Sequence, residues 1–200
     1  MLHVGFGTIN WCIAKDIVTT VGTVGALVIG ALGLRTWQRQ LRGTSEYDVA
    51  KRAVLLTYHV RDAIQAVRSP MLYFPKKEVE EGRRLDAEQR VYEDRMRILQ
   101  ERSAQLRTLS LEAKAIWREK AEAQFNPINA LVRELRAEIW LHFWLKGAYA
   151  GPGAIVDDSP NRVAANDKIV YCTSEDDEFS QRIDKAVNQV EAFFWPHIRG

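Results

Sequence analysis

Cysteine is scarce in this sequence: among its 200 residues only Cys12 and Cys172 are cysteines. Small domains that depend on disulfides carry several cysteines at short spacings, so two distant ones indicate no disulfide framework. Histidine is scarce as well, and none of the four has the spacing of a metal ligand relative to another histidine, a cysteine or an acid: His3, His59, His142 and His197. The sequence therefore predicts no metal site.

Motifs for catalysis and cofactor binding are also missing. The letters YHVRD, from Tyr58 to Asp62, are similar to part of a kinase catalytic loop. A kinase also needs a glycine-rich loop, a lysine-bearing strand and a DFG motif, and the sequence has none of them. We therefore predict that the protein is not an enzyme and that it has no catalytic residue, no cofactor and no small-molecule substrate.

Ionisable side chains are absent from the eighteen residues between Ile17 and Leu34, although charged residues are dense elsewhere. A helix of that length reaches roughly 27 Å, which is close to the thickness of the hydrocarbon core of a bilayer. Trp11 and Trp37 lie on either side of the run, at about the separation of the two headgroup zones where indole rings prefer to lie. The run therefore predicts a transmembrane helix over residues 17–37.

Two other interpretations of this run stay open. Ala31, Leu32 and Gly33 resemble a small-x-small cleavage site, which is typical of a secretion signal. The preceding sixteen residues, however, contain one lysine beside one aspartate, which is a poor positive region for a signal. The second interpretation is a buried soluble helix, but the run lacks a polar face, and each of its four glycines would cost such a helix about 1 kcal/mol relative to alanine. We favour a retained anchor.

Charge beside the run predicts its orientation. Three arginines follow it, whereas the lysine before it is nearly cancelled by the adjacent aspartate. The positive-inside rule therefore places residues 1–16 outside and the long C-terminal part in the cytoplasm, with the helix in a bacterial inner membrane. Membrane lipid is thus a predicted partner, and contact with its headgroups is expected at Arg35, Trp37, Arg39 and Arg42.

Small residues recur inside the run at four-residue spacing: Gly22, Ala26 and Gly30. This spacing lines one face of a helix with small side chains and permits a second helix to approach closely. These three residues are the predicted site of helix–helix association in the membrane.

Beyond residue 37, apolar residues recur at spacings of three and four, or of seven, which is typical of helices with one apolar face. The segment 77–107 also has charges of both signs and the sevenfold spacing of a coiled coil. Burial is expected at Val49, Ala53, Leu56, Val60, Ala63, Val67, Leu85, Tyr92, Leu99, Leu106, Leu111, Ile116, Trp117, Phe125, Ile128, Leu131, Leu135, Ile139, Phe143, Phe179, Ile183, Val187, Val190 and Phe194.

Helix boundaries are predicted from capping residues and proline. Ser45 with Asp48 makes a capping box that predicts a helix start, and Pro70 predicts its end. An interruption is expected near residues 108–110. Pro127 either starts a fresh helix capped by Asn126 or kinks a continuous one, and we favour the kink because the apolar stripe continues beyond it.

The C-terminal quarter begins with a predicted linker. Residues 147–173 are rich in turn formers, although 168–172 are compatible with a short extended piece. A last helix over 174–196 is expected to begin at a capping box of Ser174 and Asp177 and to end at Pro196.

Together these patterns predict an all-α fold. A transmembrane helix is followed by an antiparallel bundle of about four long amphipathic helices. Residues 38–146 form cytoplasmic helical hairpins, and the C-terminal helix packs on them.

One aromatic stretch, IWLHFWL from Ile139 to Leu145, is apolar nearly all round its helix. Core packing is its default role, but Trp140, Phe143 and Trp144 are also candidates for a partner surface. Nucleic-acid binding is not expected, because residues 35–107 hold sixteen basic and eleven acidic side chains, a modest and interleaved excess.

Several stretches resemble a group of uncharacterised bacterial inner-membrane proteins. They are WQRQLRG from Trp37, YHVRDAIQAVRSP from Tyr58, the segment 117–135 around Asn126-Pro127, and SEDDEFSQRIDKAVNQVEAFFWPHI from Ser174. Those proteins have one N-terminal span and a helical cytoplasmic region, so the resemblance implies the same topology here. It implies no activity and no functional residue.

The leading hypothesis is a non-enzymatic, membrane-anchored helical module: a scaffold, sensor or accessory subunit that associates with itself or with a protein partner. The alternative is a pore-forming or membrane-perturbing effector of a toxin or phage-defence system, gated by its cytoplasmic bundle. The span offers only Thr19, Thr20 and Thr23 as polar lining, which argues for a narrow or absent water path.

Overall fold

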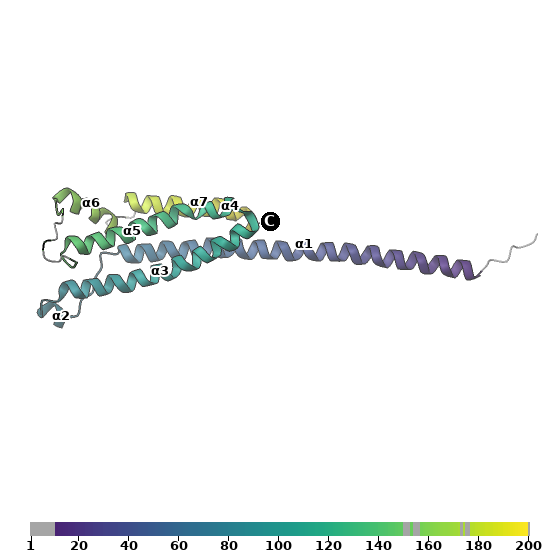
Figure 1. Cartoon of the computed structure of the whole chain (residues 1–200), viewed down its shortest axis with the longest axis horizontal. Helices are drawn as coiled ribbons and strands as arrows, with labels where there is room; N and C mark the ends of the chain where they lie inside the picture. The colour runs from purple at the N-terminus through teal and green to yellow at the C-terminus, as the bar shows by residue number, and fades with distance from the viewer. Residues whose placement is uncertain (1–10, 150–152, 154–156, 173, 175–176, 200) are drawn as a thin grey trace, which may run out of the picture. The chain divides into compact units, whose positions relative to one another are not determined.

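The computed structural model describes residues 11–149, 153, 157–172, 174 and 177–199 (Figure 1). These residues form α-helices joined by short connections and contain no strand, which confirms the all-α class. The chain divides into an N-terminal unit, Met1–Ser45, and a C-terminal unit, Glu46–Gly200. Most of the predicted N-terminal segment, 1–16, lies outside the described residues.

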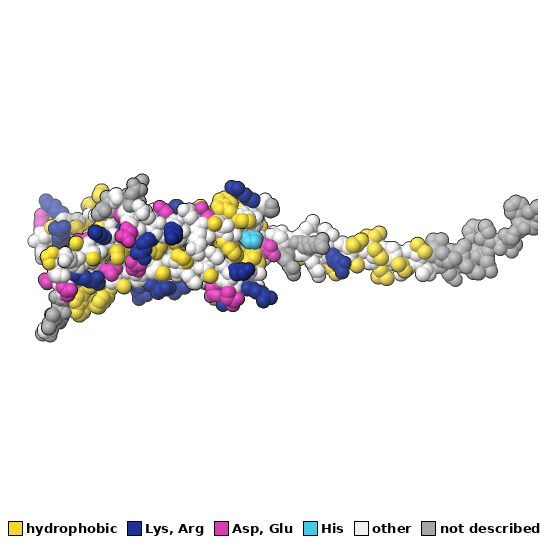
Figure 2. All heavy atoms as spheres, turned by 90° about the horizontal axis from the view of Figure 1, so that it is seen from above, with side chains coloured by type: hydrophobic (Ala, Val, Ile, Leu, Met, Phe, Trp, Pro, Cys, Tyr) yellow, Lys and Arg dark blue, Asp and Glu magenta, His cyan; other side chains and the backbone are white. Residues whose placement is uncertain are grey.

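The N-terminal unit contains the first part of helix α1, Trp11–Arg68. Its residues from Thr19 to Leu34 are exposed except for the partly buried Gly25, so no other described residue covers this part of the apolar run. This helix is long and apolar enough to cross a membrane, and signal sequences near an N-terminus have the same length and composition. Figure 2 shows hydrophobic side chains on the described surface of this run.

Helix α1 runs without a break past Ser45, where the capping box predicted the start of a new helix. It continues through residues 43–45, so the predicted helix start at Ser45 is wrong. The hydroxyl of Thr44 donates a hydrogen bond to the Gln40 carbonyl at 3.0 Å, as threonines inside helices do. Serine and glycine are weak helix formers rather than obligatory breaks, so the helix passes through them.

Four long helical segments run side by side in the C-terminal unit. They are residues 46–68 of α1, α3 (Arg84–Trp117), α5 (Asn126–Leu145) and α7 (Glu178–Arg199). The ion pair Arg52–Glu112 joins the start of this part of α1 to the end of α3, so these two run antiparallel. The hydrogen bond from the Tyr58 hydroxyl to Glu191 and the ion pair Arg68–Asp177 show the same for α1 and α7.

The described part of this unit also contains three short helices: α2 (Lys76–Glu80), α4 (Glu119–Gln124) and α6 (Pro160–Val170). Helix α5 packs against α3, α6 and α7 and so lies at the centre of the packing. One continuous hydrophobic core joins all four long segments.

The apolar stripes are confirmed almost completely. Nineteen of the twenty-four expected residues are buried, and four more are partly buried against the same core: Leu56, Leu85, Ile116 and Trp117. Leu111 is the error, because 62% of it is exposed. It follows the buried Ser110 by one position and therefore lies on a different face of α3 from the stripe.

Two other predicted boundaries are wrong. Helix α3 is not interrupted at residues 108–110: the hydroxyls of Thr108 and Ser110 donate to backbone carbonyls one turn earlier, within the helix. The break comes at Arg118, whose φ of 61° lies in the left-handed region that disfavours side chains with a Cβ. Pro127 does not kink a continuous helix, because Phe125 separates α4 from α5 and the proline lies in the first turn of α5.

The C-terminal quarter also differs from the prediction. The segment 147–173 is not only a linker, because it contains α6, and residues 168–170 are helical rather than extended. Helix α7 continues through Pro196 to Arg199. Asp177 caps the start of α7 by accepting a hydrogen bond from the Ser180 backbone N–H at 2.9 Å. The capping residue is therefore Asp177 and not Ser174, with which the predicted box began.

A fully buried arginine joins α1, α6 and α7. The guanidinium of Arg68 donates hydrogen bonds to Asp177 Oδ1 at 2.9 Å and to the Ser180 hydroxyl at 2.9 Å. It also donates to three backbone carbonyls, at 2.7 to 3.1 Å: Lys168, Ile169 and Tyr171. Carbonyls at the end of a helix lack partners inside it, so Arg68 satisfies the end of α6 and the start of α7 together.

Burial would raise the pKa of Asp177, but hydrogen bonds from Arg68 and Ser180 outweigh burial and lower it. The carboxylate is therefore ionised beside Arg68 at neutral pH. The Arg68 side chain has no exposed surface, so loss of the Asp177 carboxylate would leave a buried positive charge without its ion-pair partner.

We predict that Arg68→Lys lowers the free energy of unfolding by about 2–4 kcal/mol, because lysine cannot supply the planar set of donors that these acceptors need. The measurement is chemical denaturation of the full chain in detergent, followed by circular dichroism. Arg61→Lys is the matched control: Arg61 pairs with its neighbour Asp62 at the surface, and its loss should cost less than about 1 kcal/mol. Equal losses in the two variants would contradict the role assigned to Arg68.

Candidate functional site

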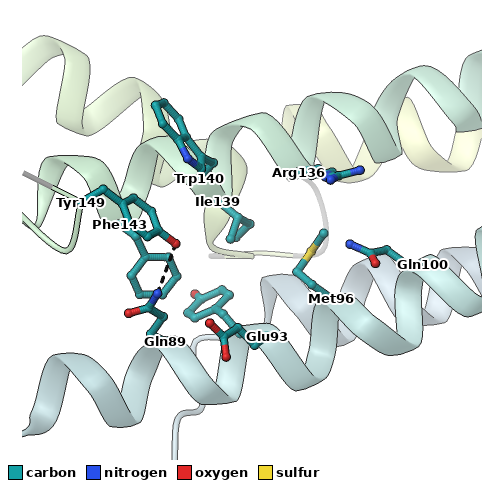
Figure 3. A pocket seen from close by; sticks show the side chains of 10 residues that line it. Gln89, Glu93, Met96, Gln100, Arg136, Ile139, Trp140, Phe143 and Tyr149 are labelled. Carbon is teal, nitrogen blue, oxygen red and sulfur yellow. Dashed lines mark hydrogen bonds between the residues drawn. The ribbon is translucent and has the colours of Figure 1, made fainter.

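A pocket opens between α3 and α5 in the C-terminal unit (Figure 3). Its volume is about 140 Å³, and it is lined by Gln89, Tyr92, Glu93, Met96, Gln100, Arg136, Ile139, Trp140, Phe143 and Tyr149. Figure 3 shows Arg136 and Gln100 at one end and Tyr149 with Gln89 at the other. The pocket is therefore polar and basic at one end and aromatic at the other.

The aromatic end depends on a turn directly after α5. Gly147 has a φ of 81°, a left-handed conformation that glycine adopts without steric cost. The N–H of Ala148 donates to the Phe143 carbonyl at 2.9 Å, which folds the chain back over the end of α5. Tyr149 then stacks on Trp140 with ring centroids 6.1 Å apart, and Gln89 Nε2 donates to the Tyr149 hydroxyl at 3.3 Å.

The three residues predicted as a partner surface have different positions. Trp140 is 53% exposed and stacks on the half-buried Trp144, with ring centroids 5.1 Å apart. Phe143 is only 2% exposed, so it belongs to the core and forms a wall of the pocket rather than an outer surface. Phe143 falls on the core side because it continues the apolar stripe of α5, and Trp140 does not.

A second pocket, of about 160 Å³, adjoins the first and shares Met96, Gln100 and Arg136 with it. Its other lining residues are Ser103, Arg107, Asn129, Val132 and Arg133. The two pockets together are called the α3–α5 groove below. The sequence carries no signal for this groove, because Arg107 is far along the chain from Arg133 and Arg136 and charged residues are frequent in both segments.

A buried polar cluster lies beside the aromatic end. Glu88 Oε1 accepts hydrogen bonds from Lys146 Nζ at 2.5 Å and from His142 Nε2 at 3.2 Å. The Tyr171 hydroxyl lies 3.3 Å from the same His142 nitrogen. Residues from α3, α5 and the end of α6 therefore meet at one carboxylate.

The Glu88 carboxylate is ionised. Burial would raise its pKa, but the hydrogen bonds from His142 and Lys146 lower it to about 2. An ionised carboxylate only accepts hydrogen bonds, so the contact requires a hydrogen on His142 Nε2. His142 is therefore a buried histidine whose Nε2–H donates to Glu88.

This cluster is placed to stabilise the fold rather than to act on a substrate. His142 is 4% exposed, and Glu88 is buried as well, so a substrate has no direct approach to either group. Among the described residues, no group of three or more histidine, cysteine, aspartate or glutamate side chains is arranged to hold a metal ion.

The predicted membrane-contact residues lie in the N-terminal unit. At Gly22 and Gly30 a Cβ would meet no heavy atom within 4 Å, so no other part of the described chain covers this small-residue face. Arg35 and Trp37 are exposed. The side chains of Arg39 and Arg42 lie outside the described part of the structure. Headgroup contact and helix association at these residues stay predictions.

Comparisons of the chain with protein-family models, with curated proteins and with solved structures found no match.

We predict that Glu88→Gln lowers the free energy of unfolding at pH 7 by about 1–3 kcal/mol, because it removes the charge that pairs with Lys146 and His142. A lowered pKa in the folded state stabilises the fold above the ordinary value of 4.5, and this contribution is lost as the pH falls towards about 2. The difference between wild type and variant should therefore shrink over that range in chemical denaturation curves.

Glu93→Gln is the matched control. Glu93 is an exposed carboxylate on the same helix with no ion pair to a described residue, and its substitution should change stability by less than about 0.5 kcal/mol at every pH. If the difference in free energy of unfolding between wild type and Glu88→Gln stays constant down to pH 3, the ionised Glu88 carboxylate does not stabilise the fold as proposed.

Proposed function

We propose that this protein is a non-enzymatic, membrane-anchored helical module that binds a protein partner or a second copy of itself. The observation that carries this proposal is the contrast between the two units. The run from Thr19 to Leu34 is apolar and uncovered, whereas the C-terminal unit buries its own apolar stripes in one core. An exposed apolar helix is stable in lipid, whereas a unit with a buried apolar core is stable in water.

Flanking charge supports an orientation with the N-terminus outside and the C-terminal unit in the cytoplasm. Arg35 follows the run directly and is exposed, and two further arginines follow within eight positions. Positive charge on the cytoplasmic side is the usual arrangement in inner membranes.

Two features support a binding role rather than catalysis. In the polar cluster around Glu88, the carboxylate and the His142 ring are buried and are hydrogen-bonded to each other, and Lys146 also donates to the carboxylate. The open surface instead offers the α3–α5 groove and its aromatic stack, and such surfaces are typical of protein recognition.

We predict that the full chain stays in the membrane pellet after washing with alkaline carbonate. The double variant Leu27→Arg/Ile29→Arg should be released in large part, because each arginine near the centre of a span costs about 2.5–3.5 kcal/mol. Leu55→Arg/Leu111→Arg is the matched control, since it adds the same charge at exposed leucines of the C-terminal unit. Release of the wild-type chain would reject the anchor.

The two native cysteines test orientation and signal cleavage together. A Cys172→Ser chain keeps only Cys12, which an impermeant thiol reagent should label on intact spheroplasts. A Cys12→Ser chain keeps only Cys172, which should be labelled after lysis alone. Loss of Cys12 from the mature chain would identify the run as a cleaved signal, and the reverse labelling pattern would reject the orientation.

We predict that Gly30→Leu reduces cross-linked dimers in membranes several-fold, because leucine fills the small-residue face that lets two spans approach. Val24→Leu, on the opposite face of the helix, should leave the cross-linked fraction unchanged. Loss of membrane potential on overexpression, abolished by Gly30→Leu, is the result expected for the pore-forming alternative. Equal dimer fractions in all three chains would remove the small-residue face from the proposal.

A further inference from the structure

Three arginines line the α3–α5 groove without an internal partner. Arg107 comes from α3, and Arg133 and Arg136 come from α5; all three are exposed. None forms an ion pair or a side-chain hydrogen bond with any residue that the structure describes. Most other arginines of the C-terminal unit do pair, for example Arg97 with Asp94 and Glu101.

The remaining lining of this basic end is neutral. The side-chain amides of Gln100 and Asn129 offer further hydrogen-bond donors, and no acid lines the second pocket. Guanidinium groups bind carboxylates with two parallel hydrogen bonds, so three of them around one groove favour a ligand with several carboxylates.

The other end of the groove suits an apolar side chain. Trp140 and Tyr149 form an exposed wall, and Met96, Ile139 and Phe143 are buried beneath it. Aromatic side chains with an exposed face are frequent anchors at protein interfaces.

We propose that the α3–α5 groove binds an acidic peptide segment of a partner protein, with its carboxylates on Arg107, Arg133 and Arg136 and an aromatic or large aliphatic side chain against Trp140 and Tyr149. This inference deepens the proposed function and rests on it only for the existence of a partner. The membrane anchor and the small-residue face of α1 are independent of it.

The size of the groove suits a peptide rather than a small molecule. Its two pockets have volumes of about 140 and 160 Å³. Pockets that enclose small molecules usually have roughly 300–1,000 Å³, so each compartment here suits one side chain. Along α5, the distance from Asn129 to Trp140 is roughly 16 Å, which about five residues of extended peptide cover.

Charge at the aromatic end favours a peptide over a nucleic acid. The carboxylate of Glu93 lines that end and has no ion pair with a described residue. Every nucleotide of a strand carries a phosphate, so a strand along the groove would place negative charge beside Glu93. A peptide can present carboxylates to the arginines and an uncharged side chain to the aromatic wall.

The test uses the full chain in nanodiscs and a library of random peptides of about eight residues, long enough to cover the groove. We expect the selected peptides to combine a cluster of Asp and Glu with a nearby Trp, Phe or Leu. The affinity of a selected peptide, measured by fluorescence anisotropy, should fall roughly tenfold or more in Arg107→Glu/Arg133→Glu/Arg136→Glu, because charged hydrogen bonds are lost and repulsion is added.

Two further variants separate charge from shape. Arg97→Glu/Arg102→Glu/Lys120→Glu changes the net charge equally at exposed positions outside the groove, and it should bind the peptide as the wild type does. Trp140→Ala should lower the affinity for peptides that contain an aromatic residue more than the affinity for matched peptides in which alanine replaces that residue. Thermal unfolding curves show whether each variant keeps the fold.

Two results of the selection would overturn the proposal: acidic peptides no more enriched on the wild type than on the triple groove variant, or enrichment of neutral or basic peptides. Two binding results would overturn it as well: an equal loss of peptide affinity in the groove and control variants, or tighter binding of an oligothymidylate than of the selected peptides. None of these results bears on retention of the chain in membranes, so the anchor proposal would stand or fall separately.

Discussion

The buried charge of Arg68 fixes the relation between three helices. A guanidinium without exposed surface must place its donors on fixed acceptors, and the acceptors here are the last carbonyls of α6 and the first polar groups of α7. One side chain at the end of α1 thus determines where α6 stops and where α7 begins. Helix α5 packs against both, so its position follows from the same contact.

The position of α5 in turn decides which surface is left for a ligand. Its apolar stripe faces the core, and the cluster at Glu88 holds its C-terminal end to α3. The remaining face presents Arg133, Arg136 and Trp140 beside α3. Both proposals rest on the same reasoning: no described residue covers the apolar run, which favours lipid, and no described residue pairs with the arginines of the groove, which favours carboxylates.

Much of the fold was predictable because helical periodicity is a local property of the sequence. The predicted stripes contained every buried apolar residue of α5 and most of those of α1 and α7. Boundaries were predicted less well, since residues that often cap helices, such as Ser45 and Ser110, are also tolerated inside them. The true break at Arg118 has no sequence signal, because no common turn former is present at that position.

The sequence by itself determined the all-α class, the exposed apolar run and the residues of the core, because each depends on the spacing of side chains along one helix. Only the tertiary structure decided that Arg68 would be buried among carbonyls at the end of α6 and that Arg107 would lie beside the arginines of α5. These are contacts between segments far apart in the chain, and local spacing does not specify which helices meet or at what height.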